Sequence, residues 1–245
     1  MSSRSEPLDS HRPIRRISGQ PDILSTADSW PGSIPAVRQI LDDGLDLGAL
    51  TILVGDNGAG KSTITEAIAM AFGMSSEGGS TGARHSTRRT ESTLSGDLKL
   101  TRGVGGARWG FFLRAETMHS FYTYLEDNPG GGDPAFHEMS HGESFLEVLA
   151  ERFGDSGLYV LDEPEAALSF DGSLALVSVL REIVAGRSAQ AVVATHSPIV
   201  AATPGADIYE VGPWGLRRSG WEELQLTTHW RAFLNDPNQY LRHLL

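Results

Sequence analysis

The 245-residue chain contains no cysteine and no long apolar run. Without cysteine it can form neither disulfides nor thiolate metal sites, which suits a reducing compartment. No apolar stretch of about 18 residues occurs, so the sequence predicts no membrane-spanning helix. The first residues lack the apolar segment of a signal peptide. We therefore expect a soluble, cytoplasmic protein.

Basic residues are also scarce, with 20 Lys and Arg against 31 Asp and Glu and a formal net charge of −11. This balance argues against a surface that is generally coated with nucleic acid. Residues 84–114 differ from the rest, because they carry seven basic and two acidic residues. The basic ones are Arg84, Arg88, Arg89, Lys99, Arg102, Arg108 and Arg114. This segment is either a solvated arm or a patch that binds a protein or nucleic-acid partner.

Apolar runs of strand length alternate with stretches of helical period, which predicts a parallel sheet flanked by helices. The expected strands are 49–54, 158–161 and 191–194, and the expected helices between them are 61–72 and 174–184. A single α/β domain over residues 21–245 accounts for this order. Residues 1–20 are expected to be a flexible leader that ends in a short edge strand at 13–17.

Two smaller parts are expected within this domain. Residues 74–115 predict an antiparallel β arm, in which strands 97–101 and 109–114 pair across a glycine-rich turn. Residues 116–156 predict a short helical lobe with helices at 116–127 and 142–153. The tail from Trp221 to Leu245 predicts one or two short helices, interrupted near Pro237.

The strongest motif is the run GDNGAGKS, which lies between an expected buried strand and an expected helix. Its glycines let the backbone wrap a phosphate chain at the positive end of a helix. The lysine would reach the β and γ phosphates and the serine would ligate Mg²⁺. The predicted nucleotide-binding residues here are Gly55, Asp56, Asn57, Gly58, Ala59, Gly60, Lys61, Ser62 and Thr63.

Polar residues follow the next two buried strands. Asp162 and Glu163 end the run LYVLDE, and His196 follows the strand 191–194. Asp162 would hold Mg²⁺ and Glu163 would polarise the attacking water. His196 would donate a hydrogen bond to the γ-phosphate or to that water. The carboxyl ends of parallel strands share one edge of a sheet, so these side chains are expected to meet the phosphate loop.

The segment His137-Glu138-Met139-Ser140-His141 matches the H-E-x-x-H pattern of zinc peptidases. That site needs both histidines in one continuous helix. Pro134 and three preceding glycines favour a loop here, and Gly142 with Glu143 suits a helix that begins near Ser140. We therefore favour a loop and helix start that grips a phosphate over a zinc site.

The order of P-loop, Ser-x-Gly-Glu, Asp-Glu-Pro-Glu-Ala-Ala-Leu and Thr-His-Ser-Pro resembles the ABC-type ATPases, and most of all the soluble stand-alone bacterial "predicted ATPase, AAA/ABC-like" proteins. The resemblance implies ATP and Mg²⁺ as cofactors and a homodimer that closes around two nucleotides. It places Ser140 and Gly142 in the signature motif, which caps the γ-phosphate of a second subunit. Residues 165–169 fall on the D-loop, His196 on the switch histidine, and Glu116 near the Q-loop, where it could ligate Mg²⁺.

Only 23 residues separate Glu116 from Ser140, which argues against the longer helical lobe of a transporter subunit. No heptad array is present for a coiled coil. The sequence thus favours a stand-alone ATP-hydrolysing enzyme with an unknown partner. A slow ATP-switched binding module is the alternative. Trp30, upstream of the P-loop, is expected to stack on adenine, whereas Tyr159 in a buried strand is expected to pack in the core.

Overall fold

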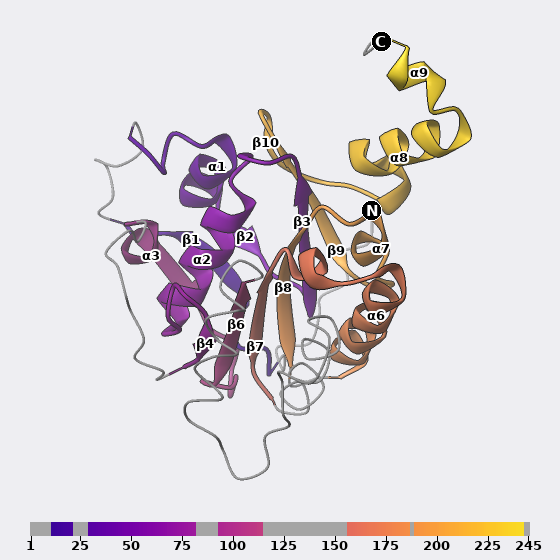
Figure 1. Ribbon diagram of the computed structural model, residues 1–245. Helices are drawn as coiled ribbons and strands as arrows, with labels where there is room; N and C mark the ends of the chain where they lie inside the picture. Colours follow the sequence, from indigo (N-terminus) through magenta and orange to yellow (C-terminus); the bar gives the residue numbers. More distant parts are fainter. Residues whose placement is uncertain (1–10, 22–28, 82–92, 115–155, 187–188, 243–245) are drawn as a thin grey trace, which may run out of the picture.

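The computed structural model describes residues 11–21, 29–81, 93–114, 156–186 and 189–242. Within these ranges a seven-stranded sheet with the order β10-β9-β3-β8-β7-β6-β4 runs through the molecule (Figure 1). Its strands are β3 (Leu50–Gly55), β4 (Gly79–Ser80), β6 (Gly110–Arg114), β7 (Leu158–Asp162), β8 (Gln190–Thr195), β9 (Asp207–Gly212) and β10 (Gly215–Arg218). The neighbours from β9 to β6 are parallel, and β10 and β4 are antiparallel at the two edges. The predicted mainly parallel sheet is confirmed.

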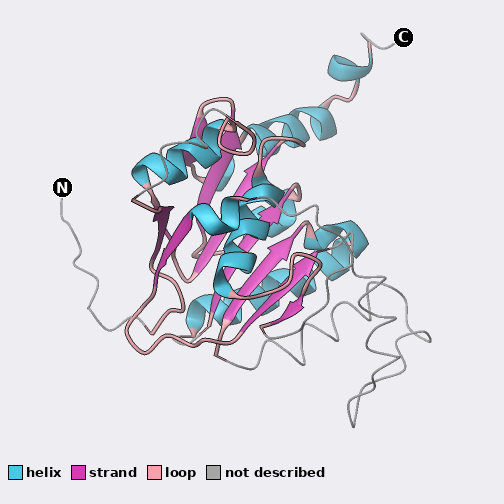
Figure 2. Cartoon of the chain, turned by 90° about the vertical axis from the view of Figure 1, so that its left-hand side faces the viewer, coloured by secondary structure: helices cyan, strands magenta, loops and turns pink. Residues whose placement is uncertain are grey.

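Helices cover both faces of this sheet (Figure 2). The described helices are α1 (Pro35–Asp43), α2 (Lys61–Phe72), α3 (Leu94–Asp97), α6 (Phe170–Ala185), α7 (Pro198–Ala201), α8 (Gln225–Asn235) and α9 (Asn238–Leu241), with 3-10 turns η3 (Pro164–Ala167) and η4 (Trp221–Glu223). The predicted helix 61–72 is confirmed with the same bounds, and it stops at Gly73 in the left-handed conformation.

The central strands bury side chains on both faces of the sheet, which is why their sequences are continuous apolar runs. In β3, Leu53 belongs to the cluster that packs with α1 and α2. Ile52 and Val54 belong to the opposite cluster, which includes α6 and α7 residues such as Leu176 and Val200. This two-sided packing fixes the carboxyl ends of β3, β7 and β8 next to one another.

A second sheet lies on the α1 and α2 side, with the order β2-β1-β5 among the described strands. It consists of β1 (Arg16–Gly19), β2 (Leu45–Asp46) and β5 (Leu98–Thr101), all antiparallel. Of the predicted arm 74–115, only β5 belongs to this sheet, and the strand pair predicted for the arm is wrong. Strand β6 does not pair with β5; it joins the main sheet parallel to β7, because its residues 110–113 are all buried.

The flexible leader expected for residues 1–20 is wrong for residues 11–20, and the edge strand expected at 13–17 is found as the inner strand β1 (Arg16–Gly19). Ile14 and Ile17 are fully buried, and β1 is the middle strand of its sheet. The buried side chain of Gln190 accepts a hydrogen bond from Ile14 N (2.9 Å) and donates to Ile14 O (2.7 Å) and Gly48 O (2.8 Å). This amide ties the N-terminal segment to the start of β8.

The C-terminal helices α8 and α9 extend away from the sheet at the upper right of Figure 1. They confirm the predicted pair of short helices with a break at Asp236 and Pro237. No helix among the described residues is long and apolar enough to cross a membrane. The predicted helical lobe 116–156 lies almost wholly outside the described residues.

Candidate nucleotide-binding site

The predicted phosphate loop connects the end of β3 at Gly55 to the start of α2 at Lys61. Gly58 and Gly60 have φ angles of 78° and 103°, a region that L side chains rarely adopt. A Cβ at Gly60 would also lie 2.6 Å from Ile34 Cγ2. The glycines at these positions are therefore required by the backbone, and a glycine-rich turn before a helix N-terminus is the geometry that cradles phosphates.

Lys61 turns back over this loop. Its Nζ donates hydrogen bonds to Gly55 O at 2.8 Å and to Asp56 O at 3.0 Å, and the residue is only 3% exposed. Burial lowers the pKa of Lys61, and the nearby carboxylates, Glu163 foremost, oppose that shift. The ammonium is thus held beside the loop in a polar setting where an anion would stabilise its charge.

Asp162 ends β7 directly beside the start of α2. The Ser62 side chain forms a hydrogen bond to its carboxylate, Thr65 Oγ1 lies 3.4 Å from Oδ1, and Arg114 Nε lies 3.4 Å from Oδ2. Burial raises the pKa of Asp162, while Ser62 and Arg114 oppose the shift. A buried carboxylate next to a hydroxyl is a pair of hard oxygen ligands, so these two residues fit Mg²⁺.

Glu163, His196 and Lys61 form a second contact group at the same edge. His196 Nε2 lies 2.8 Å from Glu163 Oε1 and 3.0 Å from Lys61 Nζ. One ring nitrogen either donates or accepts, so it can satisfy only one of these two neighbours at a time. Glu163 is the one non-glycine residue with positive φ (51°) in the described part of the chain. Competing contacts and an unusual backbone at one carboxylate are features of functional sites.

The structure therefore brings together Gly55 to Thr63, Asp162, Glu163 and His196, as predicted. Ser140, Gly142 and Glu116 lie outside the described residues, as does the His137–His141 motif. Among the described residues no group of three or more His, Asp or Glu side chains could hold a metal ion by itself.

One residue of the site and one contact within it were missed in the sequence. Arg114 at the end of β6 pairs with Asp162 and places Nη1 3.0 Å from Glu66 Oε2 on α2. Its position as the last residue of a buried strand was the available signal. Arg114 faces inward, so it does not belong to the exposed basic patch predicted for residues 84–114. Glu165 was assigned only to the D-loop, and its contact with the turn that carries His196 was missed.

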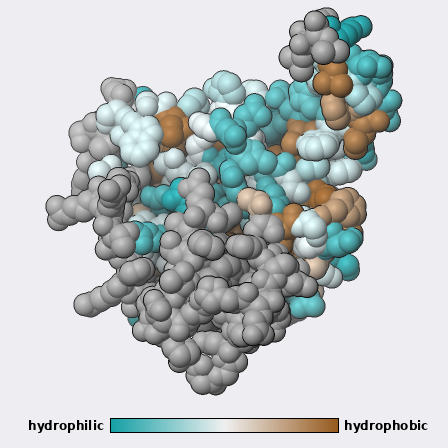
Figure 3. Space-filling model, viewed as in Figure 1, coloured by the Kyte–Doolittle hydropathy of each residue, from teal (hydrophilic) through white to brown (hydrophobic). Residues whose placement is uncertain are grey.

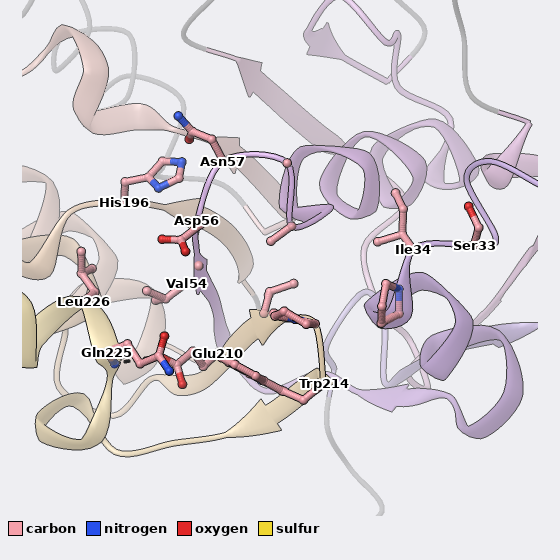
Figure 4. A pocket seen from close by; sticks show the side chains of 17 residues that line it. Ser33, Ile34, Val54, Asp56, Asn57, His196, Glu210, Trp214, Gln225 and Leu226 are labelled. Carbon is pink, nitrogen blue, oxygen red and sulfur yellow. Dashed lines mark hydrogen bonds between the residues drawn. The ribbon is translucent and has the colours of Figure 1, made fainter.

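Two cavities flank the phosphate loop. One, of about 390 Å³, is lined by Trp30, Lys61, Ser62 and Glu163. The other, of about 590 Å³, lies on the β9 and β10 side. Figure 4 shows Asp56, Asn57 and His196 along its upper part, with Glu210, Gln225 and Trp214 below. Of the predicted site residues, Lys61, Ser62 and Glu163 line the first cavity and His196 lines the second, so the candidate site extends over both sides of the phosphate loop.

A comparison with protein families matches residues 50–131, about a third of the chain, to the family described as "AAA domain, putative AbiEii toxin, Type IV TA system". The match begins in β3 and includes the phosphate loop, which precedes the acidic strand β7 and the histidine strand β8 in one parallel sheet. A phosphate loop between a parallel strand and a helix, in a mainly parallel sheet flanked by helices, is the arrangement of a P-loop NTPase fold. No curated protein matches the sequence.

Solved structures similar to this chain include an SMC head domain from Thermotoga maritima. It has 18% identity and a TM-score of 0.44, over 72% of this chain and 93% of that one. Another is cbiO1 from Clostridium perfringens, part of the ABC transporter complex cbiONQ. Its identity is 15% and its TM-score 0.43, over 82% of this chain and 90% of that one.

Proposed function

We propose that the protein binds Mg-ATP at the phosphate loop and hydrolyses it. The observation that carries the proposal is the cluster at the loop, where His196 Nε2 lies within 3.0 Å of both Glu163 Oε1 and Lys61 Nζ. It joins a phosphate-binding cation, a carboxylate that can act as a base and a histidine that can donate a hydrogen bond. These are the groups that an attack of water on a γ-phosphate requires.

Each residue has one task in this reaction. Lys61 and the loop backbone bind the β and γ phosphates, and Glu163 accepts a proton from the water that attacks the γ-phosphorus. The bond from that phosphorus to the bridging oxygen breaks, which releases ADP and phosphate. His196 donates a hydrogen bond to the γ-phosphate. Ser62 and Asp162 would hold Mg²⁺, which neutralises phosphate charge.

Trp30 is the proposed adenine-stacking residue. It is 64% exposed and lines the same cavity as Gly60, Lys61 and Ser62. Tyr159, by contrast, is fully buried and packs edge-to-face on Trp109 with ring centroids 5.5 Å apart. The expectation that Tyr159 packs in the core is confirmed, and an exposed ring beside the phosphate loop supports stacking on a base.

We also propose that two copies close around two nucleotides. Phe170 and Leu174, at the start of α6, are 66% and 47% exposed, directly after the segment 165–169 that resembles a D-loop. Figure 3 shows apolar surface on the right-hand side of this view, over the region of α6 and the C-terminal helices. Exposed apolar side chains next to the catalytic edge support its burial by a second subunit.

A Glu163→Gln variant tests hydrolysis and dimerisation together. Removal of the base keeps the γ-phosphate in place, so the variant should bind Mg-ATP, release no phosphate and accumulate as a dimer. Adding Ser140→Arg should return it to a monomer that still binds ATP, because the new charge blocks the contact from the second subunit. Light scattering after size-exclusion chromatography reports the mass. A variant that stays monomeric at saturating ATP rules out the composite site.

The second candidate is a binding module that ATP switches and that hydrolyses slowly. The exposed basic residues Lys99, Arg102 and Arg108 favour it, because they could contact a polyanion. Steady-state phosphate release by the wild-type chain, with and without DNA or RNA, separates the two candidates. Fast release without a polyanion supports the enzyme. Very slow release with salt-sensitive polyanion binding supports the module.

A further inference from the structure

Two bridges join the segment after β7 to the end of β8 and the turn that follows it. The first is a backbone hydrogen bond from Glu163 N to Ala194 O, 2.9 Å long. The second is made by the side chain of Glu165 on η3. Its Oε1 accepts hydrogen bonds from Thr195 Oγ1 at 2.7 Å and from His196 N at 2.6 Å. The residue two positions after the proposed base thus holds the backbone of the proposed histidine.

Thr195 extends this bridge along the turn. It is fully buried, and its hydroxyl accepts a hydrogen bond from Ser197 N at 2.9 Å while it donates to Glu165. A hydroxyl that donates and accepts at once has a fixed orientation. The Glu165 carboxylate therefore fixes three consecutive residues of the turn, with His196 in the middle.

The same segment also meets the ring of His196. Glu165 binds the backbone of His196, and Glu163 Oε1 lies 2.8 Å from its Nε2. Residues 163–165 therefore contact both the backbone and the ring of His196. Ionised acceptors make hydrogen bonds that are shorter and stronger than neutral ones, which suits a contact that must hold a catalytic distance.

We propose that Glu165 is a positioning residue for His196, which it holds in reach of Glu163 and of the γ-phosphate. The proposal rests on the proposed function, since His196 must act on ATP for its position to matter. Among the described residues, Glu165 Oε2 is buried without a hydrogen-bond partner, so Oε1 alone makes the bridge. A side chain that keeps one acceptor at the Oε1 position should therefore preserve the bridge.

Four variants test this role through the kinetics of ATP hydrolysis. Glu165→Ala should lower kcat about 10- to 100-fold, as a misplaced catalytic group does, with KM for ATP within about twofold. Glu165→Asp has a shorter side chain that cannot reach both donors, so its kcat should lie between those of Glu165→Ala and the wild type. Glu165→Gln keeps the acceptor and should retain at least about a third of kcat. Glu182→Ala, an exposed carboxylate on α6, is the matched control and should behave as wild type.

A double-mutant cycle decides whether Glu165 acts through His196. In a His196→Ala background, Glu165→Ala should cost less than about twofold in kcat, because the residue that it positions is gone. Equal losses in both backgrounds would overturn the proposal, and so would a Glu165→Gln variant as impaired as Glu165→Ala. Thermal unfolding of each variant shows which losses of activity come from unfolding. If Glu165→Ala unfolds, Glu165→Asp replaces it in the cycle.

Imidazole NMR of the full chain separates this inference from the proposed function. The His196 ring signal is assigned by its loss in His196→Ala. It should shift or broaden in Glu165→Ala and stay in place in Glu165→Gln. A wild-type protein that releases no phosphate would contradict the proposed function, while the ring signal still reports on positioning. An unchanged ring signal in Glu165→Ala would overturn the positioning role whatever the activity.

Discussion

Two buried acids near the carboxyl ends of parallel strands, Asp162 in β7 and Glu210 in β9, differ in how their oxygens are satisfied. Glu210 is 3% exposed and accepts hydrogen bonds from Gln225 N at 2.7 Å and from Arg217 Nε at 2.8 Å, with a further contact from Arg217 Nη2. Asp162 is 4% exposed and accepts a hydrogen bond from the Ser62 side chain, but its contacts with Thr65 and Arg114 are both 3.4 Å long.

This difference separates a structural carboxylate from one that is open to a ligand. The Arg217 guanidinium that binds Glu210 also stacks on Trp214, 4.2 Å from the ring centroid, so protein donors satisfy Glu210 even though it lines the larger cavity. At the β7 end burial raises the pKa of Asp162 and lowers that of Lys61, so both charged forms are disfavoured by their surroundings. A phosphate and a cation would stabilise them, and neighbouring groups with perturbed pKa values are candidates for a functional site.

The largest expected effect comes from removing the Lys61 ammonium group beside the phosphate loop. Lys61→Ala should abolish ATP binding or lower hydrolysis by at least about 100-fold, because no other described donor reaches the loop from that position. The fold should persist, since burial disfavours the charged ammonium and the variant removes it. Isothermal titration with ATP, together with circular dichroism, measures both.

Lys99→Ala, an exposed lysine on β5, is the matched control and should bind ATP as the wild type does. If Lys61→Ala unfolds while its folded fraction hydrolyses ATP normally, Lys61 is structural. The phosphate-loop assignment is then wrong.

Exchanging the two acids for amides tests the comparison directly. Glu210→Gln should destabilise the fold by about 1–3 kcal/mol, because it weakens a satisfied buried network, and leave ATP binding intact. Asp162→Asn should remove the Mg²⁺ dependence of ATP binding and yet stabilise the protein without ligand. Arg114 keeps its pair with Glu66 in that variant. Urea unfolding and ATP titration with and without Mg²⁺ measure the two effects.

The pH dependence of this stabilisation has a definite sign. The pKa of Asp162 is raised by burial, so the folded chain binds a proton at pH values where the unfolded chain has lost it. Stability therefore falls as pH rises from the ordinary aspartate pKa through the raised one, and stays lower above it. Asp162→Asn should melt above wild type at about pH 8, with the gap closing as pH falls. A gap that widens at low pH would contradict the assigned shift.

Local signals predicted which edge of the sheet carries the candidate site. The run Gly55 to Ser62 carries its own glycine and lysine spacing, and the apolar strands before Asp162 and His196 are short and continuous. Pairing between distant segments was harder to predict. The glycines at 103–106 suggested a hairpin, whereas burial of Phe111, Phe112 and Leu113 on both faces placed β6 inside the parallel sheet.

Side-chain contacts between different strands could not be predicted from the sequence. Arg114 meets Glu66 and Asp162 over separations of 48 residues in each direction, and the hydrogen bonds of Glu165 reach about 30 residues along the chain. Nothing in the local pattern of these residues specifies a partner. The helix α1 and the hairpin β9 and β10 were also missed, because their apolar residues are few and closely followed by glycine or charge.

The smallest expected effect concerns which side of the phosphate loop binds the adenine base of ATP. Trp30 and Trp214 are both exposed and lie on opposite cavities, but Trp214 already stacks with Arg217. Trp30→Ala should weaken ATP binding by about 1–3 kcal/mol, the usual worth of a base stacked on an aromatic ring. Inorganic triphosphate has no base, so its affinity should not change in that variant.

Trp214→Ala is the matched control and should bind ATP within about twofold of wild type. Competition of both ligands with a fluorescent ATP analogue gives the affinities. A larger loss in Trp214→Ala than in Trp30→Ala would move the base to the β9 and β10 side, and an equal loss of ATP and triphosphate in Trp30→Ala would show that Trp30 supports the loop instead.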